Sequence, residues 1–237
     1  MTVLRPAGAG QVADLAAFLG RLVRWDKAAV VRLQGVPVPG GAAVGVFGRP
    51  PFGDVLAVRT VELAGDEPVA DVTVSAGQLL DGIDEAAGRA VVPPGVTGPS
   101  WAGVLPPRDG WERTAEPAAA LLRATAAEVV AEFRSRTEAL PADQRTRARL
   151  DALAEEIWSR SLPGTALPLR AVHAAHALGF LRPVRAAVGA GAVAPLDAAA
   201  GDAGTALLAR GPWLRLRTPY GSVAVRRAVP KLSVRPV

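Results

Sequence analysis

The chain has 237 residues, of which 50% are hydrophobic and 21% are charged, and this is the composition of a globular protein. It contains no cysteine, which excludes a disulfide framework and thiolate chemistry. It also lacks a run of about 18 apolar residues, and residues 1–10 lack the apolar stretch of a secretory signal. We therefore expect a soluble, cytoplasmic protein without a membrane partner.

The net charge of +5 is distributed unevenly. Residues 1–115 hold 10 basic and 12 acidic groups, residues 116–161 hold 7 and 8, and residues 162–237 hold 10 and 2. Most basic residues are arginine and asparagine is absent, which indicates a GC-rich genome. Codon bias acts on the whole chain, so it does not explain an excess confined to the last third. The asymmetry predicts an anionic partner for the C-terminal part.

The first part of the chain predicts a helix followed by an antiparallel sheet. Apolar residues recur every three or four positions between Gln11 and Trp25, the spacing of a helix with one buried face. Residues 35–41 are predicted to form a loop, because glycine and proline are frequent there. Short connections favour an antiparallel meander. Alternating or apolar segments predict strands over 29–33, 44–47, 55–63 and 72–74.

Two details of this part make specific predictions. Ser75-Ala76-Gly77-Gln78 has the form of a capping box and predicts a short helix that ends at Gly88. In the strand over 55–63, Arg59 lies in phase with apolar neighbours, which we interpret as a bulge or an exposed strand end.

Residues 90–117 form a long segment rich in proline and glycine that contains Trp101 and Trp111. Loops of this length are uncommon in compact domains unless they are functional or cover another part. We interpret both indoles as packing groups at the edge of the core, as large aromatic side chains usually are. A ligand site beside Trp101 and Trp111, in a small-molecule enzyme or ligand-binding protein, is the alternative.

Residues 117–160 predict two helices in an antiparallel hairpin. Apolar residues keep helical spacing in both halves, and Pro141-Ala142-Asp143 between them supplies a stop and an N-cap. The first half presents Leu122, Ala126, Val129, Phe133, Thr137 and Leu140, and the second presents Leu150, Leu153 and Ile157. These faces must be covered, so a structural homodimer through residues 117–160 is a third interpretation.

A further helix is predicted over 168–181 and carries His173 and His176, the only histidines. Their spacing places the two rings at neighbouring positions, where they are weak candidates for metal ligands. A zinc site needs a third protein ligand, and the chain has no HExxH or CxxC motif. We therefore predict no metal and no cofactor. Residues 183–204 are rich in alanine and glycine and predict no regular structure.

Residues 213–227 predict a β-hairpin around a turn at 218–221. If Arg217 lies opposite Ser222, the apolar residues of the two strands meet on one face. The expected apolar pairs are Leu216 with Val223 and Leu214 with Val225.

The other face of this hairpin is the candidate binding site for a nucleic acid or another anion. It gathers Trp213, Arg215, Arg217 and Arg226, with the Arg226 guanidinium placed to stack on the indole, and Arg227 follows. Basic side chains of this kind bind phosphates in a salt-dependent way. Helices over 143–160 and 168–181 precede the hairpin, and the order of these elements is similar to that of a winged-helix module.

No segment carries a reaction signature, so we predict no catalytic residue. A GxSxG motif is absent, and no lysine with serine or threonine completes a phosphate loop after Gly8-Ala9-Gly10. The adjacent acids Glu155 and Glu156 point in different directions on a helix and are a poor acid–base pair.

Several motifs give the chain a resemblance to an uncharacterised protein family of GC-rich actinobacteria, over most of its length. They are Phe47-Gly48-Arg49-Pro50-Pro51, Trp101 followed by Leu105-Pro106-Pro107-Arg108, and Thr218-Pro219-Tyr220-Gly221-Ser222. The first part is also similar in topology to one sliding-clamp repeat. Neither resemblance implies a functional residue.

Together these patterns predict an α+β protein. Residues 1–115 form an antiparallel sheet with two helices, and residues 116–237 form a mainly helical part closed by the basic hairpin. We expect a non-catalytic binding or regulatory protein whose partner is a nucleic acid or an acidic protein.

Overall fold

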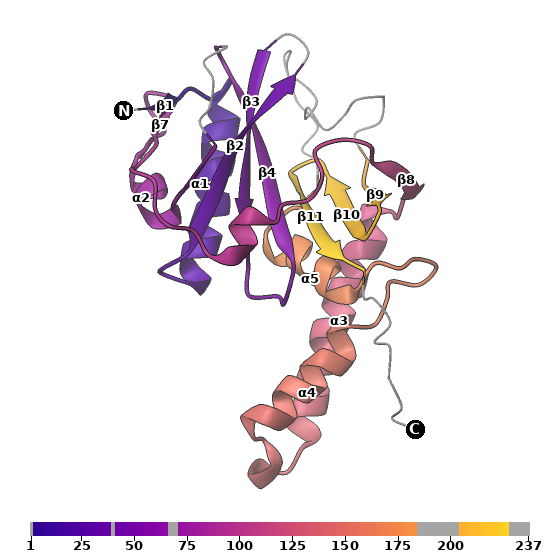
Figure 1. The fold of residues 1–237 in the computed structure, drawn as a ribbon. Helices are drawn as coiled ribbons and strands as arrows, with labels where there is room; N and C mark the ends of the chain where they lie inside the picture. Colours follow the sequence, from indigo (N-terminus) through magenta and orange to yellow (C-terminus); the bar gives the residue numbers. More distant parts are fainter. Residues whose placement is uncertain (1, 39–40, 66–70, 184–203, 228–237) are drawn as a thin grey trace, which may run out of the picture.

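Figure 1 shows the computed structural model, which describes residues 2–38, 41–65, 71–183 and 204–227. In chain order the first elements are β1 (Val3–Leu4), α1 (Ala9–Trp25), β2 (Val30–Val38), β3 (Gly41–Gly48), β4 (Leu56–Leu63), β5 (Val72–Ser75), α2 (Ala76–Asp81), β6 (Ile83–Asp84) and β7 (Arg89–Val91). They are followed by η1 (Ser100–Gly103), β8 (Glu112–Ala115), α3 (Ala119–Ala139), η2 (Ala142–Gln144), α4 (Arg147–Trp158), α5 (Leu169–Ala177), β9 (Ala206–Arg210), β10 (Trp213–Thr218) and β11 (Gly221–Arg226). This mixture of helices and antiparallel strands confirms the α+β class.

An eight-stranded antiparallel sheet is the centre of the fold, in the order β5-β2-β3-β4-β11-β10-β9-β8. A small three-stranded sheet, β1-β7-β6, lies beside it. The large sheet contains strands from both ends of the chain, and they join where β11 pairs with β4. The two predicted parts therefore share one sheet.

The register of the predicted C-terminal hairpin, β10 with β11, is confirmed. Arg217 lies opposite Ser222, and Trp213 lies opposite Arg226. The apolar pairs are Leu216 with Val223 and Leu214 with Val225, as expected from the period of two in the sequence.

The prediction that this hairpin is the wing of a winged-helix module is wrong. A wing projects from its helices, whereas β11 pairs with β4 on one side and β10 pairs with β9 on the other. The β9 strand, which we did not predict, fills the position where a wing would meet solvent. The hairpin is consequently an interior part of the sheet.

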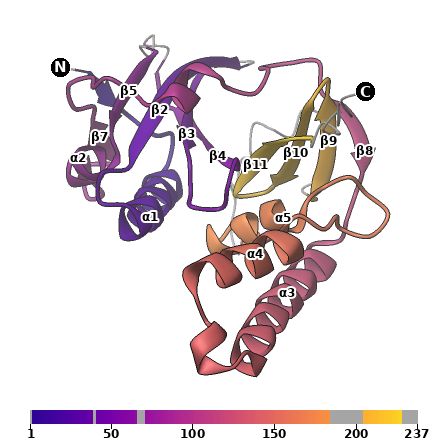
Figure 2. The ribbon, with the colours of Figure 1, turned by 60° about the horizontal axis from the view of Figure 1, so that its bottom comes forward.

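Helices cover one face of the sheet, and the main hydrophobic core lies between these helices and the sheet. Figure 2 shows α1, α3 and α5 on the same side of the strands. The apolar side chains of the C-terminal hairpin face these helices and are buried together with those of α1, α3 and α5. Of the described helices, none is long and apolar enough to cross a membrane.

Two local boundaries differ from the sequence prediction. The predicted loop over 35–41 is wrong, because β2 continues to Val38 and β3 begins at Gly41, with alanine and glycine residues pairing along the ladder. The helix after the capping box ends at Asp81 instead of Gly88, and the following residues pair as β6 and β7. A side chain at Gly82 would meet the Val91 carbonyl oxygen at 2.6 Å, so this close approach requires glycine. The segment 184–203, for which no regular structure was predicted, lies outside the described residues.

The predicted helical hairpin, α3 with α4, is present and projects away from the sheet (Figure 1). Only the first half of α3 is buried, through Leu122, Ala126 and Val129, whereas Phe133 is half-buried against Trp158. Farther out, ion pairs connect the two helices: Arg136 with Glu156 at 2.6 Å, and Arg160 with Glu132. The homodimer through residues 117–160 stays a prediction.

We predict that Leu216→Ala lowers the free energy of unfolding by about 3 kcal/mol, because its fully buried side chain packs between sheet and helices. Leu121→Ala is the matched control, since Leu121 is 52% exposed, and it should change stability by less than about 0.5 kcal/mol. Urea unfolding measures both. Equal effects would contradict the assignment of this face to the core.

Candidate functional site

The predicted binding residues lie on the sheet face opposite the helices. Arg226, Trp213 and Arg210 occupy one row across β11, β10 and β9, because Trp213 is paired with both arginines. The Arg226 guanidinium carbon lies 5.0 Å from the centre of the Trp213 ring. Trp213 is only 7% exposed, so its role is to support Arg226.

The next row on this face contains Arg215 of β10 and Arg113 of β8, with Leu208 between them. The side chain of Arg215 is half-buried; its Nε donates to Ser222 Oγ at 2.8 Å. Its guanidinium carbon also lies 5.8 Å from the centre of the Trp111 ring. Arg217 lies one row farther along β10 and is half-buried too.

We call the five arginines that share this side of the sheet the basic face. They are Arg113, Arg210, Arg215, Arg217 and Arg226. Arg227 follows at the end of β11 and is exposed, as is Arg226. The basic face thus holds most of the predicted site, although its members differ in exposure.

Sequence reasoning missed Arg113 and Arg210. They join the site only because β9 pairs with β10 and β8 pairs with β9, and no local sequence pattern predicts these pairings. Each contacts a carboxylate: Arg210 binds Asp109 at 2.5 Å, and Arg113 binds Glu116. The Asp109 side chain is 90% exposed, and ion pairs of such exposure contribute little.

Trp101 and Trp111 lie in the strap, as we name residues 92–111, which crosses in front of β4 and β11 in Figure 1. Both indoles pack against a second apolar cluster formed by Leu56, Trp213 and Ala224. The indole N–H of Trp111 donates to the Pro107 carbonyl oxygen at 2.9 Å. These contacts favour the packing interpretation, and the ligand site at the two tryptophans stays a prediction.

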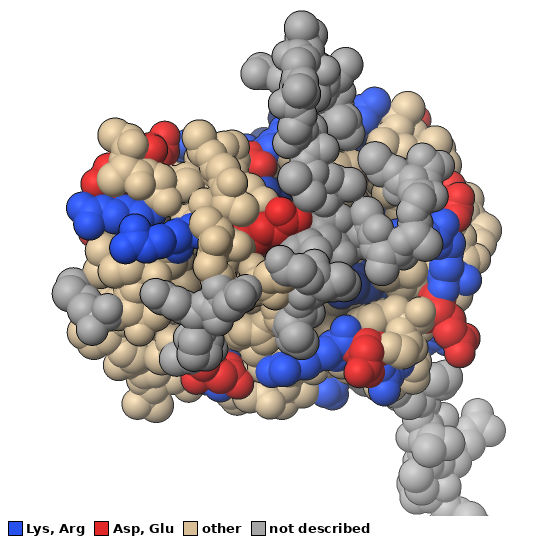
Figure 3. Space-filling view, turned by 90° about the horizontal axis from the view of Figure 1, so that it is seen from above, with Lys and Arg blue, Asp and Glu red and all other residues tan. Residues whose placement is uncertain are grey.

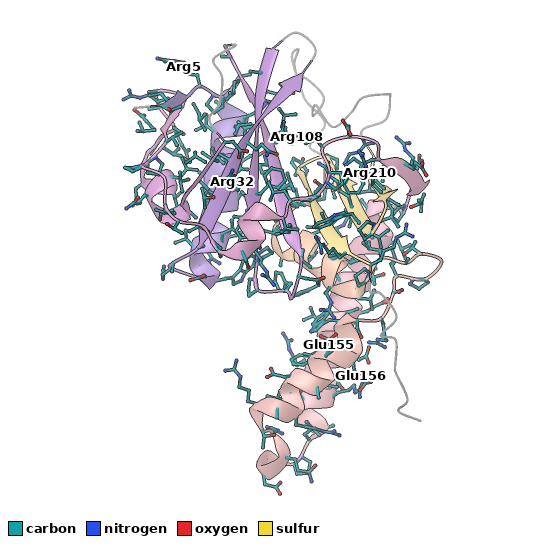
Figure 4. All side chains as sticks on the ribbon, in the orientation of Figure 1. Arg5, Arg32, Arg108, Glu155, Glu156 and Arg210 are labelled. Carbon is teal, nitrogen blue, oxygen red and sulfur yellow. The ribbon has the colours of Figure 1, made fainter. Side chains whose placement is uncertain are left out.

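Arginines beside the strap bind neutral or acidic partners on the same sheet face. Arg32 lies 2.6 Å from Asp71, and this hydrogen bond is the main reason why the pKa of Asp71 is lowered. Arg108 of the strap donates to Gln34 at 3.2 Å. Figure 4 labels Arg32 and Arg108, and Figure 3 shows blue and red side chains interspersed on the top of the molecule. Arg32 therefore has an acidic partner and Arg108 a neutral one.

The histidine pair does not form a metal site in the described part of the chain, where no group of three potential ligands comes together. His176 is exposed. His173 is stacked on Trp158, with 4.6 Å between ring centres, and meets the edge of Phe52 at 4.9 Å. Its Nδ1 is buried without a partner among the described residues. Burial, and then the charge of His176, lowers the pKa of His173.

Glu155 and Glu156 have separate partners, as expected for neighbours on a helix (Figure 4). Glu155 binds Arg170 of α5 at 2.6 Å, whereas Glu156 binds Arg136 of α3. The hydrogen bond from Arg136 is the main cause of the lowered pKa of Glu156. Each carboxylate therefore connects α4 to a different helix.

A second group of charges lies where the two ends of the chain meet, and the sequence prediction missed it. Asp14 of α1 binds Arg59 of β4 at 2.7 Å and Arg182, beyond α5, at 2.5 Å. Arg59 also donates to the Tyr220 carbonyl oxygen, and the Arg182 guanidinium lies 3.6 Å from the centre of the Tyr220 ring. We call these residues, together with Arg21, the arginine cluster.

The interpretation of Arg59 as a bulge or an exposed strand end is wrong. The β3–β4 ladder is regular, with Val46 opposite Arg59, and Arg59 is only 8% exposed on the helix side of the sheet. The phase of the apolar residues in β4 was correct, and the arginine is accommodated because Asp14 faces it from α1. Burial lowers the pKa of Arg59, while Asp14 acts in the opposite direction.

Comparison with known families divides the chain into two matched segments. Residues 1–103 match a family model described as Domain of unknown function (DUF8010), and residues 106–230 match one described as Domain of unknown function (DUF8185). The chain belongs to the DUF8185 family. No curated protein and no solved structure matches it. The two models meet before β8, and the predicted domain boundary at 115/116 stays a prediction.

We predict that stability decreases as the pH falls below about 6.5, the usual histidine pKa, because the unfolded chain then binds a proton that folded His173 excludes. The free energy of unfolding stops decreasing once the pH is below the lowered pKa of His173 in the folded state. Above that pKa it decreases by at most about 1.4 kcal/mol per pH unit. His173→Phe should remove this component, whereas His176→Gln should retain the larger part of it, because burial is the main cause of the lowered pKa of His173. Denaturant unfolding at pH 7.5 and 5.5, values on either side of about 6.5, measures the difference.

We predict that Asp14→Asn lowers the free energy of unfolding by about 2 kcal/mol or more, since it removes the charged acceptor of two arginines, one of them buried. Asp151→Asn is the matched control: its carboxylate is 70% exposed and lies 3.6 Å from Arg147. The control should change stability by less than about 0.5 kcal/mol in the same urea experiment. Similar losses in both variants would contradict a structural role for the arginine cluster.

Proposed function

We propose that the chain is a non-catalytic binding protein and that a nucleic-acid backbone lies across its basic face. The observation that carries this proposal is the row formed by Arg226, Trp213 and Arg210, with Arg215 and Arg113 in the next row. The basic face holds four of the ten basic residues of the last third, namely Arg210, Arg215, Arg217 and Arg226, and Arg113 joins them from β8.

The spacing of these arginines suits an extended anion. Neighbouring strands are about 4.8 Å apart, and alternate residues of one strand are about 6.7 Å apart. The backbone position of Arg215 is therefore about 8 Å diagonally from those of Arg226 and Arg210, which are about 10 Å from each other across β10. Long side chains at such intervals are better placed to contact successive phosphates of a nucleic acid than to contact one small anion together. Contacts to phosphates do not require a particular base sequence.

The arginines of the site differ in exposure, and we expect the exposed ones to contribute more to the binding of phosphates than the half-buried ones. Arg226 and Arg227 are exposed, and the Trp213 ring limits the motion of the Arg226 guanidinium. Arg215 and Arg217 are half-buried, and Arg215 lies near Trp111 of the strap. Asp109 competes for Arg210, so we expect moderate affinity that falls steeply with salt.

We predict that labelled duplex DNA and single-stranded RNA bind the wild-type chain, and that Arg226→Gln/Arg227→Gln weakens binding and lowers the duplex salt slope by about 2. Fluorescence anisotropy at several salt concentrations gives both quantities. Arg134→Gln/Arg147→Gln is the matched control, because it removes the same charge from exposed positions on the helical hairpin. The control should retain the wild-type slope.

Three results would contradict the proposal. Wild-type chain without affinity for either nucleic acid at low salt would exclude this partner. Equal weakening by the two double variants would indicate a general effect of charge. Binding of polyglutamate in place of both nucleic acids would instead identify an acidic protein as the partner class.

A further inference from the structure

The arginine cluster carries more positive charge than its partners neutralise. Around Asp14 lie Arg21, Arg59 and Arg182, and Asp14 is the one carboxylate that acts on Arg21 and Arg59 within the described chain. Burial lowers the pKa of Arg21 and Arg59, and the nearby charge of Arg182 lowers both further. Like charges held together in this way attract an anion.

One donor in the cluster, the Nε of Arg59, has no acceptor among the residues that the structure describes. Arg59 uses its two terminal nitrogens, one on Asp14 and one on the Tyr220 carbonyl oxygen. Its Nε is buried and has no hydrogen-bond partner among the described residues. A buried donor without a partner costs free energy unless a water molecule or an ion satisfies it.

The cluster is held in shape and is partly exposed to solvent. The Tyr220 ring fixes the plane of the Arg182 guanidinium at 3.6 Å, and the Tyr220 hydroxyl donates to the Pro183 carbonyl oxygen. The side chains of Arg182 and Asp14 are 37% and 23% exposed. The Arg182 guanidinium is therefore already oriented and accessible to a small anion, at little cost in side-chain entropy.

We infer that the arginine cluster, with Arg21, Arg59 and Arg182 around Asp14, binds a small oxyanion of the phosphate type, free or as a monoester. Guanidinium groups match the geometry of phosphate oxygens and bind them through paired hydrogen bonds. A second negative charge favours phosphate over a carboxylate, because Asp14 leaves most of the arginine charge uncompensated. The site lies on the helix side of the sheet, opposite the basic face, so it does not depend on the proposed function.

We predict that inorganic phosphate binds the full chain in isothermal titration calorimetry at constant ionic strength. Arg182→Gln should weaken this binding about tenfold or more, because a charge-assisted hydrogen-bond donor is lost. Asp14→Asn should strengthen it, since the competing carboxylate is removed; a folding defect does not produce tighter binding. Arg147→Gln and Arg226→Gln/Arg227→Gln are controls and should leave it unchanged.

The ligand series identifies what the cluster binds. Phosphoserine binding as well as inorganic phosphate would indicate a monoester site, and binding of inorganic phosphate alone would indicate a site for the free ion. Equal responses to phosphate, acetate and chloride would show screening only and would overturn the inference. Loss of phosphate binding in Arg226→Gln/Arg227→Gln, with retention in Arg182→Gln, would place the anion on the basic face and would overturn it as well.

Discussion

The pairing of β11 with β4 is the contact on which the rest of the structure depends. Ser222, Val223 and Ala224 lie opposite residues 56–58, so a strand from the end of the chain completes a sheet begun by its first part. Without this contact, each strand would present an unpaired edge, which is a template for aggregation. The pairing also combines the segments matched by two family models into one sheet with helices on one side.

The two faces of this single sheet carry different kinds of side chain. On the helix side, apolar residues from both segments form one core, interrupted by the ion pairs of Arg59 and Arg182 with Asp14. On the other side, the basic face is bordered by the strap, whose Trp111 lies near Arg215. An alternating strand places its two sets of side chains in these different environments, which explains how leucine and arginine can follow each other along β10.

The arginine cluster and the stacked His173 lie at contacts between elements that are far apart in sequence. Asp14 from the first helix contacts Arg182, and Phe52 from the β3–β4 connection meets His173 on α5. Both contacts couple the electrostatics of a buried group to the association of the two segments. The same contacts that hold the segments together are therefore sensitive to charge substitutions and to pH.

Local patterns in the sequence determined the helix over α1, the helical hairpin, the Ser75 cap and the full register of the C-terminal hairpin. Each depends on residues close in sequence, such as Ser75 Oγ accepting from the Gln78 amide. The period of two also placed Arg226 beside Trp213. Tertiary structure alone decided that this hairpin lies inside the sheet, that Arg113 and Arg210 join its basic face, and that Arg59 is buried. Those outcomes depend on β4, β8, β9 and Asp14 as distant partners, and a local pattern carries no information about which distant strand or carboxylate satisfies it.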